Sequence, residues 1–231
     1  MNKSLTWTSC TVSNAKGVDF ELLNDEQKES LQKNRIDTHY KKGEMICKNG
    51  TFAPHIIYLR KGLAKVFLDN GTESLILKII PPGNIIGLTS IMDGNNIFHY
   101  SAMAYEDSEV CLINIDTFRT LLRENSKFAN QIINIFCENS LQIYNRFFCF
   151  TNKQLYGRLA DTLLCLSDRI FKQDTFTLNI SRKDLAELTG MSTESVIRML
   201  KKLKDDKIIH MEKKTIQILD YDVLQKISMY G

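Results

Sequence analysis

Ser181–Asp205 has the sequence SRKDLAELTGMSTESVIRMLKKLKD, and this pattern predicts two short helices joined by a tight turn. Ser181 can cap the first helix, and Asp184 three residues later completes a capping box. Gly190 can end that helix in the left-handed conformation that glycine adopts at little cost, and Ser192 can cap the second helix. This arrangement is typical of a helix-turn-helix motif, whose second helix enters the major groove of DNA.

The second predicted helix has an apolar face and a polar face. Its apolar side chains recur at helical spacing, at Val196, Met199, Leu200 and Leu203. The candidate DNA-binding residues come from the polar face, from the caps and from the first turns. They are Ser181, Arg182, Ser192, Thr193, Glu194, Ser195, Ile197, Arg198 and Lys201.

Positive charge is concentrated around this motif. The chain of 231 residues has a net charge of +3, and residues 181–214 contain nine basic and six acidic residues. The other residues, 21 basic and 21 acidic, are therefore neutral as a group. A positive module suits contact with DNA phosphates, although a solvated helix face would have the same composition.

A different pattern covers Thr38 to Ile115. Runs of β-branched and aromatic residues alternate with turn signals about every ten residues, which predicts a small antiparallel barrel or sandwich. A short helix capped by Asn24 is expected before it. The expected turns are centred on Gly43, Gly50, Gly62, Gly71, Gly83 and Gly94.

A long helix is expected over Ser126–Phe150, which contains neither Pro nor Gly. Side chains recur along it at alternating steps of three and four, as in a coiled coil, and one Asn could fix the register between two chains. The alternative is that this stripe packs on the barrel of its own chain. A dimer is favoured because helix-turn-helix proteins use two-fold symmetry to reach two successive major grooves. The predicted dimer contacts are Phe128, Ile132, Ile135, Asn139, Ile143 and Phe150.

The last part of the chain predicts a wing beside the motif. Gln154–Phe171 is expected to be helical, and Phe176–Ile180 is expected to be a short strand. KIIHMEKKTIQIL, at Lys207–Leu219, predicts a hairpin. Lys213 and Lys214 would lie at its tip, where they could contact phosphate.

This order of elements resembles the Crp/Fnr family of bacterial transcription regulators. KGEMICKNGTFAPHIIYLRKGLAKVF and PPGNIIGL resemble the glycine patterns of the family's barrel, and ISRKDLAELTGMSTESVIRML is similar to its helix-turn-helix motif almost position by position. The resemblance implies an α+β fold in three parts. These are an antiparallel β-roll or jelly-roll sensor domain over residues 1–120, a dimerisation helix over 121–152 and a winged helix-turn-helix domain over 153–231.

The resemblance also implies a function. A homodimeric, sequence-specific DNA-binding regulator is expected, and not an enzyme. Its expected partners are double-stranded DNA with a two-fold symmetric site, a second copy of the chain and RNA polymerase. The alternative class is a cyclic-nucleotide-binding regulatory protein built on the same barrel.

Glu194 and Arg198 match the base-reading pair of the family. A carboxylate can accept a hydrogen bond from the amino group of cytosine, and a guanidinium can donate two to guanine. The alternative is an ion pair within the helix. Ile197 stands where the oxygen-sensing branch usually has serine. It could contact a thymine methyl group or be partly buried against the core of the motif.

The barrel is expected to sense a signal that the sequence does not identify and to control DNA binding through the central helix. The cAMP-binding branch has a glutamate after its glycine turn and an Arg-Ser pair about ten residues later, and Leu88 and Phe98–His99 stand near these positions. Residues 79–118 contain no Lys or Arg. A cyclic phosphate would therefore be buried without a fixed cation, which is costly. We expect no binding of cAMP.

The metal cofactors of the family find incomplete ligand sets in this sequence. Cys111 and Cys10 match only two of the four thiolates that an iron–sulfur cluster usually needs, so a cluster and other metal sites are not expected. Haem, in a haem- or redox-sensing regulator, is the alternative, but no spacing singles out a pair of axial ligands. The candidates are His39, His55, His99, Met45, Met92, Met103 and Cys47.

The sequence predicts a cytoplasmic protein without membrane contact. The first ten residues, MNKSLTWTSC, contain no apolar core of signal-peptide length. No apolar run in the chain approaches the length of about 18 residues that a membrane-spanning helix needs.

Overall fold

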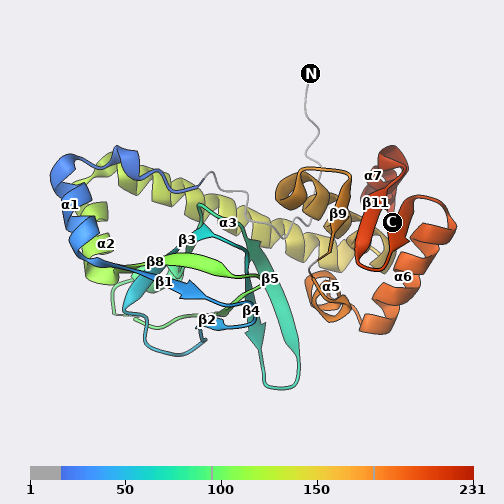
Figure 1. Cartoon of the computed structure of the whole chain (residues 1–231), viewed down its shortest axis with the longest axis horizontal. Coiled ribbons are helices and arrows are strands. Elements are labelled where there is room, and N and C mark those ends of the chain that lie inside the picture. The colour runs from blue at the N-terminus through green and yellow to red at the C-terminus, as the bar shows by residue number, and fades with distance from the viewer. Residues whose placement is uncertain (1–16, 95, 179) are drawn as a thin grey trace. The chain divides into compact units, whose positions relative to one another are not determined.

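The computed structural model describes residues 17–94, 96–178 and 180–231, which form two compact units (Figure 1). The barrel unit contains residues 17–72 and 77–139. The C-terminal unit contains residues 140–231 together with the short segment 73–76. Among the described residues, no helix is both long and apolar enough to cross a membrane.

The barrel unit contains two four-stranded sheets, with strand orders β1-β8-β3-β6 and β2-β7-β4-β5. Strand pairing is antiparallel, as between β3 and β8, where Ile57 lies opposite Leu112. This confirms the predicted antiparallel architecture. The strands are β1 (Arg35–Tyr40), β2 (Met45–Cys47), β3 (His55–Lys61), β4 (Ala64–Asp69), β5 (Ser74–Ile80), β6 (Ile85–Ile86), β7 (Ser101–Ala104) and β8 (Ser108–Asn114).

The turns and the first helix of this unit are as predicted. Asn24 caps α1 (Asp25–Lys33) through a capping box with Gln27. The expected turn glycines adopt positive φ angles, which residues with a side chain rarely adopt. These are Gly43, Gly50, Gly62, Gly71, Gly83 and Gly94.

The barrel unit has two apolar cores, and the sheet that contains β3 contributes side chains to both. Alternate residues of a strand point to opposite faces, so that Ile56 of β3 enters one core and Ile57 enters the other. The core with Ile57 contains side chains of both sheets. The core with Ile56 contains side chains of α2 (Ile115–Glu124) and α3 (Ser126–Asn152). The core with Ile56 therefore attaches the long helix α3 to the barrel.

This attachment corrects the predicted dimer contacts on α3. Phe128, Ile132 and Ile135 are 0%, 3% and 7% exposed and lie in the core of the barrel unit. Asn139 accepts a hydrogen bond from the ammonium of Lys78 in β5, so its side chain is engaged within its own chain. The prediction that Phe128, Ile132 and Ile135 contact a second chain was wrong, and the alternative, a stripe packed on its own barrel, applies to these three. Asn139 is half-buried, and its contact with a second chain stays a prediction.

The C-terminal unit packs helices around a small sheet (Figure 1). The sheet has the order β10-β11-β9, and the predicted hairpin is its β10–β11 pair. β9 adds a third strand, with Phe176 opposite Ile216. The elements are α4 (Leu155–Cys165) with a π-helical continuation to Phe171, β9 (Thr175–Thr177), α5 (Arg182–Thr189), α6 (Thr193–Asp205), β10 (Ile209–Glu212), β11 (Thr215–Ile218) and α7 (Tyr221–Tyr230).

Replacing Phe128 with alanine should test the core position of α3. Removal of a buried phenyl ring costs about 3–5 kcal/mol of unfolding free energy. The matched control is Phe52→Ala in the same unit, because Phe52 is 66% exposed and its loss should cost less than about 1 kcal/mol. Denaturant unfolding at two protein concentrations measures both. If the loss at Phe128 is small or appears only at low concentration, Phe128 does not belong to the core of its own chain.

Candidate nucleic-acid interface

The helix-turn-helix motif forms through the predicted caps. The Ser181 hydroxyl accepts a hydrogen bond from the Asp184 amide at 3.0 Å, and Asp184 Oδ2 accepts one from the Ser181 amide at 3.1 Å. Gly190 ends α5 with a φ of 62°. The Ser192 hydroxyl accepts a hydrogen bond from the Ser195 amide at the start of α6. The two serine caps, Ser181 and Ser192, thus bind amides that a helix start leaves without a partner within the helix.

Burial of one side of α6 determines which of its side chains face solvent. Val196, Leu200 and Leu203 are at most 1% exposed, and residues three or four apart lie on the same helical face. The opposite face is exposed and carries four of the predicted contacts: Glu194, Ile197, Arg198 and Lys201. Ser192 is also exposed, whereas Thr193 and Ser195 are half-buried.

Glu194 and Arg198 both lie on the exposed face, one helical turn apart. The carboxylate of Glu194 accepts hydrogen bonds from its own amide and from the Ser192 hydroxyl, which lower the pKa of Glu194 below its usual range. Among the described residues, no ion pair joins Glu194 to Arg198. At neutral pH the face therefore presents a carboxylate acceptor and a guanidinium donor.

Ile197 lies between these two residues and is 53% exposed. About half of its surface is covered, so partial burial against the core of the motif and contact with a base both stay predictions. An exposed β-branched side chain on a polar face can contact the methyl group of thymine.

Two predicted contacts lie beside the wing. Ser181 is exposed at the start of α5. Arg182 is half-buried, and its Nη2 lies 3.1 Å from Met211 Sδ in β10. Burial lowers the pKa of Arg182. Lys213 and Lys214 are exposed at the turn of the β10–β11 hairpin, where Lys213 has a φ of 52°.

Arg146 of α3 is hydrogen-bonded to α5, the first helix of the motif. Arg146 is 7% exposed, and its Nη2 donates a hydrogen bond to the Leu188 carbonyl in the last turn of α5 at 2.9 Å. Burial lowers the pKa of Arg146 to about 10, so the group stays charged at neutral pH. A cation at a helix C-terminus is stabilising because the last carbonyls carry partial negative charge.

Phe150, a half-buried member of the predicted seam, reinforces this connection within its own chain. The centre of its ring lies 4.8 Å from the guanidinium carbon of Arg146 and 5.5 Å from that of Arg158. A Cβ at Gly190 would lie 3.5 Å from the same ring. Phe150 therefore packs against the helix-turn-helix turn of its own chain. Of the six predicted seam residues, Ile143 alone is largely exposed, at 63%.

Comparison with known proteins agrees with this geometry. Residues 157–227 match the Crp-like helix-turn-helix domain, and residues 37–125 match the cyclic nucleotide-binding domain. The transcriptional activator protein Anr of Pseudomonas protegens is 26% identical over 185 residues, which cover 78% of this chain and 75% of that protein. The probable transcriptional regulator flp of Lacticaseibacillus casei is 25% identical over 213 residues, 90% of this chain and 94% of that protein.

The structure of FixK2 from Bradyrhizobium japonicum shares the fold. It superimposes with a TM-score of 0.76 at 18% identity and covers 85% of this chain and 98% of that one. The chain belongs to the Crp/Fnr family of transcription regulators. Its helix-turn-helix is a DNA-binding domain, and the relatives named here are regulators of transcription.

Within this Crp/Fnr barrel, apolar side chains fill the positions that the cAMP-binding branch uses. Leu88 and Phe98 are 4% and 6% exposed. A Cβ at Gly87 would lie 3.2 Å from the Phe98 ring, and the Gly87 amide donates to the Tyr100 hydroxyl at 2.8 Å. Arg119 follows this stretch, but it donates to Asn96 Oδ1 at 2.7 Å and to backbone carbonyls. That the chain does not bind cAMP remains a prediction.

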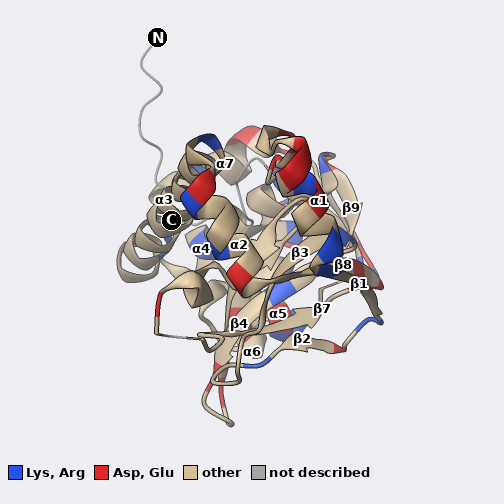
Figure 2. Ribbon diagram, turned by 90° about the vertical axis from the view of Figure 1, so that its left-hand side faces the viewer, with Lys and Arg blue, Asp and Glu red and all other residues tan. Residues whose placement is uncertain are grey.

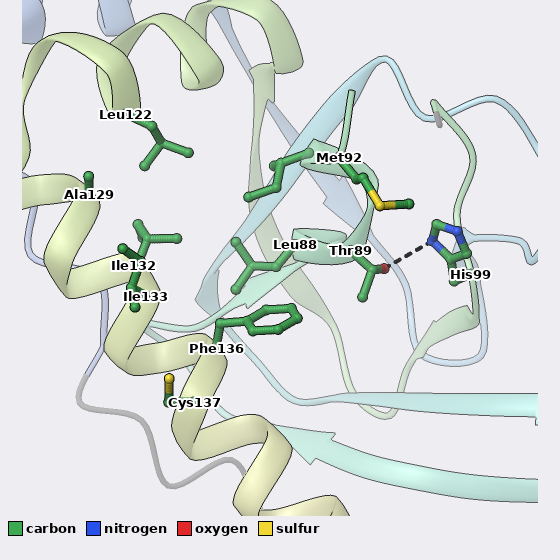
Figure 3. A pocket seen from close by; sticks show the side chains of 11 residues that line it. Leu88, Thr89, Met92, His99, Leu122, Ala129, Ile132, Ile133, Phe136 and Cys137 are labelled. Carbon is green, nitrogen blue, oxygen red and sulfur yellow. Dashed lines mark hydrogen bonds between the residues drawn. The ribbon is translucent and has the colours of Figure 1, made fainter. Parts of the chain in front are cut away.

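The metal-ligand candidates do not converge. Cys111 is 3% exposed in the apolar core with α2 and α3, and Cys10 lies outside the described residues. In the part of the chain that the structure describes, no three His, Cys, Asp or Glu residues gather closely enough to hold a metal ion. Of the haem candidates, Met92 and His99 line one cavity. His99 Nδ1 lies 3.1 Å from the Thr89 hydroxyl, with the imidazole beyond Thr89 and away from α3 (Figure 3). The structure singles out no pair for haem.

Replacing Arg146 with methionine should loosen α5. The change removes a charged donor worth about 1.5–3 kcal/mol, so amide hydrogen exchange in α5 should accelerate about tenfold or more. The matched control is Lys183→Met, because Lys183 is exposed and its ion pair with Glu187 spans 3.9 Å. The control should change exchange by less than about twofold. Unchanged exchange in Arg146→Met would show that this guanidinium does not hold the motif.

Proposed function

We propose that the chain acts as a homodimer that reads a two-fold symmetric DNA site, and that the barrel unit controls this reading through α3. The observation that carries the proposal is the exposed face of α6, where Glu194 and Arg198 stand free of each other. Arg198 donates two hydrogen bonds to a guanine, and Glu194 accepts one from a cytosine. Ile197 contacts a thymine methyl group, and Lys201 contacts phosphate.

A dimer is supported by a second stripe of side chains on α3. In the first half of the helix, its members directly follow the buried residues Phe128, Ile132 and Ile135 in the sequence. It recurs at steps of four and three along Ala129, Ile133, Phe136, Ser140, Ile143 and Phe147, which we call the α3 stripe. Its four large apolar members are 57%, 47%, 63% and 70% exposed. Of the 27 residues of α3, the charged ones are Lys127, Glu138 and Arg146, and much of the helix is accordingly tan in Figure 2. Such a stripe is typical of a helix that pairs with another helix.

Control of DNA binding follows from the continuity of α3. The residues of α3 up to 139 belong to the barrel unit, and those from 140 belong to the C-terminal unit. Phe128 lies in the barrel core, and Arg146 binds the last turn of α5. A signal that binds one arrangement of α3 more tightly shifts the population towards it, which changes the spacing of the two α6 helices. Contact with RNA polymerase remains a prediction from the family.

Replacing Phe147 with glutamate should dissociate the dimer. The change places a charge at the C-terminal end of the apolar stripe, on its most exposed member, and a desolvated unpaired charge is costly. Sedimentation equilibrium should show a dimer for the wild type and a monomer for the variant. The matched control is Asn134→Glu, which adds the same charge at an exposed position outside the stripe and should leave the dimer intact. A dimer that resists Phe147→Glu would place the interface elsewhere.

Replacing Arg198 with alanine should reduce specificity. Loss of a bidentate guanine contact costs about 1–3 kcal/mol, so affinity for the specific site should fall about 5- to 150-fold while binding to random DNA changes little. Lys201→Ala is the matched comparison, because loss of a phosphate contact weakens all sequences alike and lowers the salt slope by about 1. Gel retardation over a salt series distinguishes the two. Full specificity in Arg198→Ala would refute its role in base reading.

A further inference from the structure

The barrel unit contains an apolar cavity between the turn after Gly87 and α3. Its volume is about 740 Å³, within the range of about 300–1,000 Å³ that is typical of small-molecule sites. Leu88 and Met92 form one wall, and Ala129, Ile133 and Phe136 form the other. Figure 3 shows Leu88 and Phe136 extending towards each other from the two walls.

The cavity contains no charged lining residue. The backbone carbonyls of the turn after Gly87 are not free to bind a ligand either, because Arg119 binds them. It donates hydrogen bonds to the carbonyls of Ser90, Ile91 and Met92 at 3.3, 3.1 and 3.2 Å, so these oxygens are satisfied by the guanidinium. The polar groups at the edge are the Thr89 hydroxyl and His99, which interact with each other at 3.1 Å.

We infer that this cavity binds an uncharged, largely apolar small molecule with at most one hydrogen-bonding group. A charged ligand would lose its hydration without finding a partner charge, whereas apolar surface is stabilised by leaving water. Thr89 is placed to contact the single polar group. The ligand touches Ile133 and Phe136, which also belong to the α3 stripe. It therefore acts on the helix that pairs the two copies, and in this respect the inference rests on the proposed function.

A fluorescence titration of the full chain with N-phenyl-1-naphthylamine, an uncharged probe, tests the inference. Saturable binding of one molecule per chain is expected. The anionic relative 8-anilinonaphthalene-1-sulfonate should bind at least about tenfold more weakly, because its sulfonate finds no cation. Equal binding of the two probes, or no saturable binding, would overturn the inference.

Two variants that fill the cavity from opposite walls locate the site. Ala129→Phe and Met92→Trp should each weaken binding of the uncharged probe about tenfold or more. Asn134→Phe adds the same ring as the first variant on the outer face of α3 and should leave binding unchanged. Circular dichroism verifies that each variant is folded. If one of the two filling variants does not fold, binding to the other one tests the inference. Unchanged binding in folded filling variants would overturn the inference.

Two further measurements, probe binding to Phe147→Glu and DNA affinity in the presence of the probe, distinguish a failure of this inference from a failure of the proposed function. All lining residues belong to the barrel unit, so binding is expected to persist in the Phe147→Glu variant even if the chain does not dimerise or bind DNA. If the probe binds Phe147→Glu but not the wild type, a second copy occupies the cavity and the inference is wrong. A change of at least about threefold in DNA affinity on adding the probe supports its role as effector, and an unchanged affinity contradicts that role.

Discussion

The structure depends on how α3 divides its apolar side chains between two neighbouring faces. Phe128, Ile132 and Ile135 are buried in the barrel unit, and removing this much apolar surface from water fixes the helix to its own chain. The α3 stripe, one residue away, stays exposed. A helix buried on every side could not pair with a second copy. Because of the one-residue offset, the same helix is part of the domain core and keeps an exposed stripe for the proposed dimer.

The second half of α3 positions the DNA-binding surface. Arg146 donates to the Leu188 carbonyl at the end of α5, and Phe150 packs beside Gly190 in the turn before α6. These contacts bind the helix-turn-helix to α3 at the turn between α5 and α6. Core packing then orients that face, because Val196, Leu200 and Leu203 leave α6 no other buried side. The barrel core, the proposed dimer surface and the motif that carries the proposed base-reading residues thus each involve α3.

The features that could be predicted from the sequence are those set by local chemistry. Ser181, Gly190 and Ser192 act through hydrogen bonds and backbone angles within a few residues, and the structure shows each of them as expected. The assignment of Phe128, Ile132 and Ile135 to a seam was wrong because periodicity identifies an apolar stripe but not the partner that covers it. Phe150 lies in the predicted period, yet its partners Arg158 and Gly190 come from later elements. The apolar cavity depends on contacts between Arg119 and a turn about 28 residues earlier, and no short motif signals such an arrangement.

The central claim is that two copies of α6, paired through α3, read two successive major grooves. Methylation interference on a bound DNA site tests it most directly, because a methyl group on guanine N7 blocks the acceptor that Arg198 requires. The account predicts two symmetric groups of interfering guanines, about 10 base pairs apart or at a multiple of that spacing. Interference in a single half-site, or binding that tolerates methylation of every guanine, would contradict it.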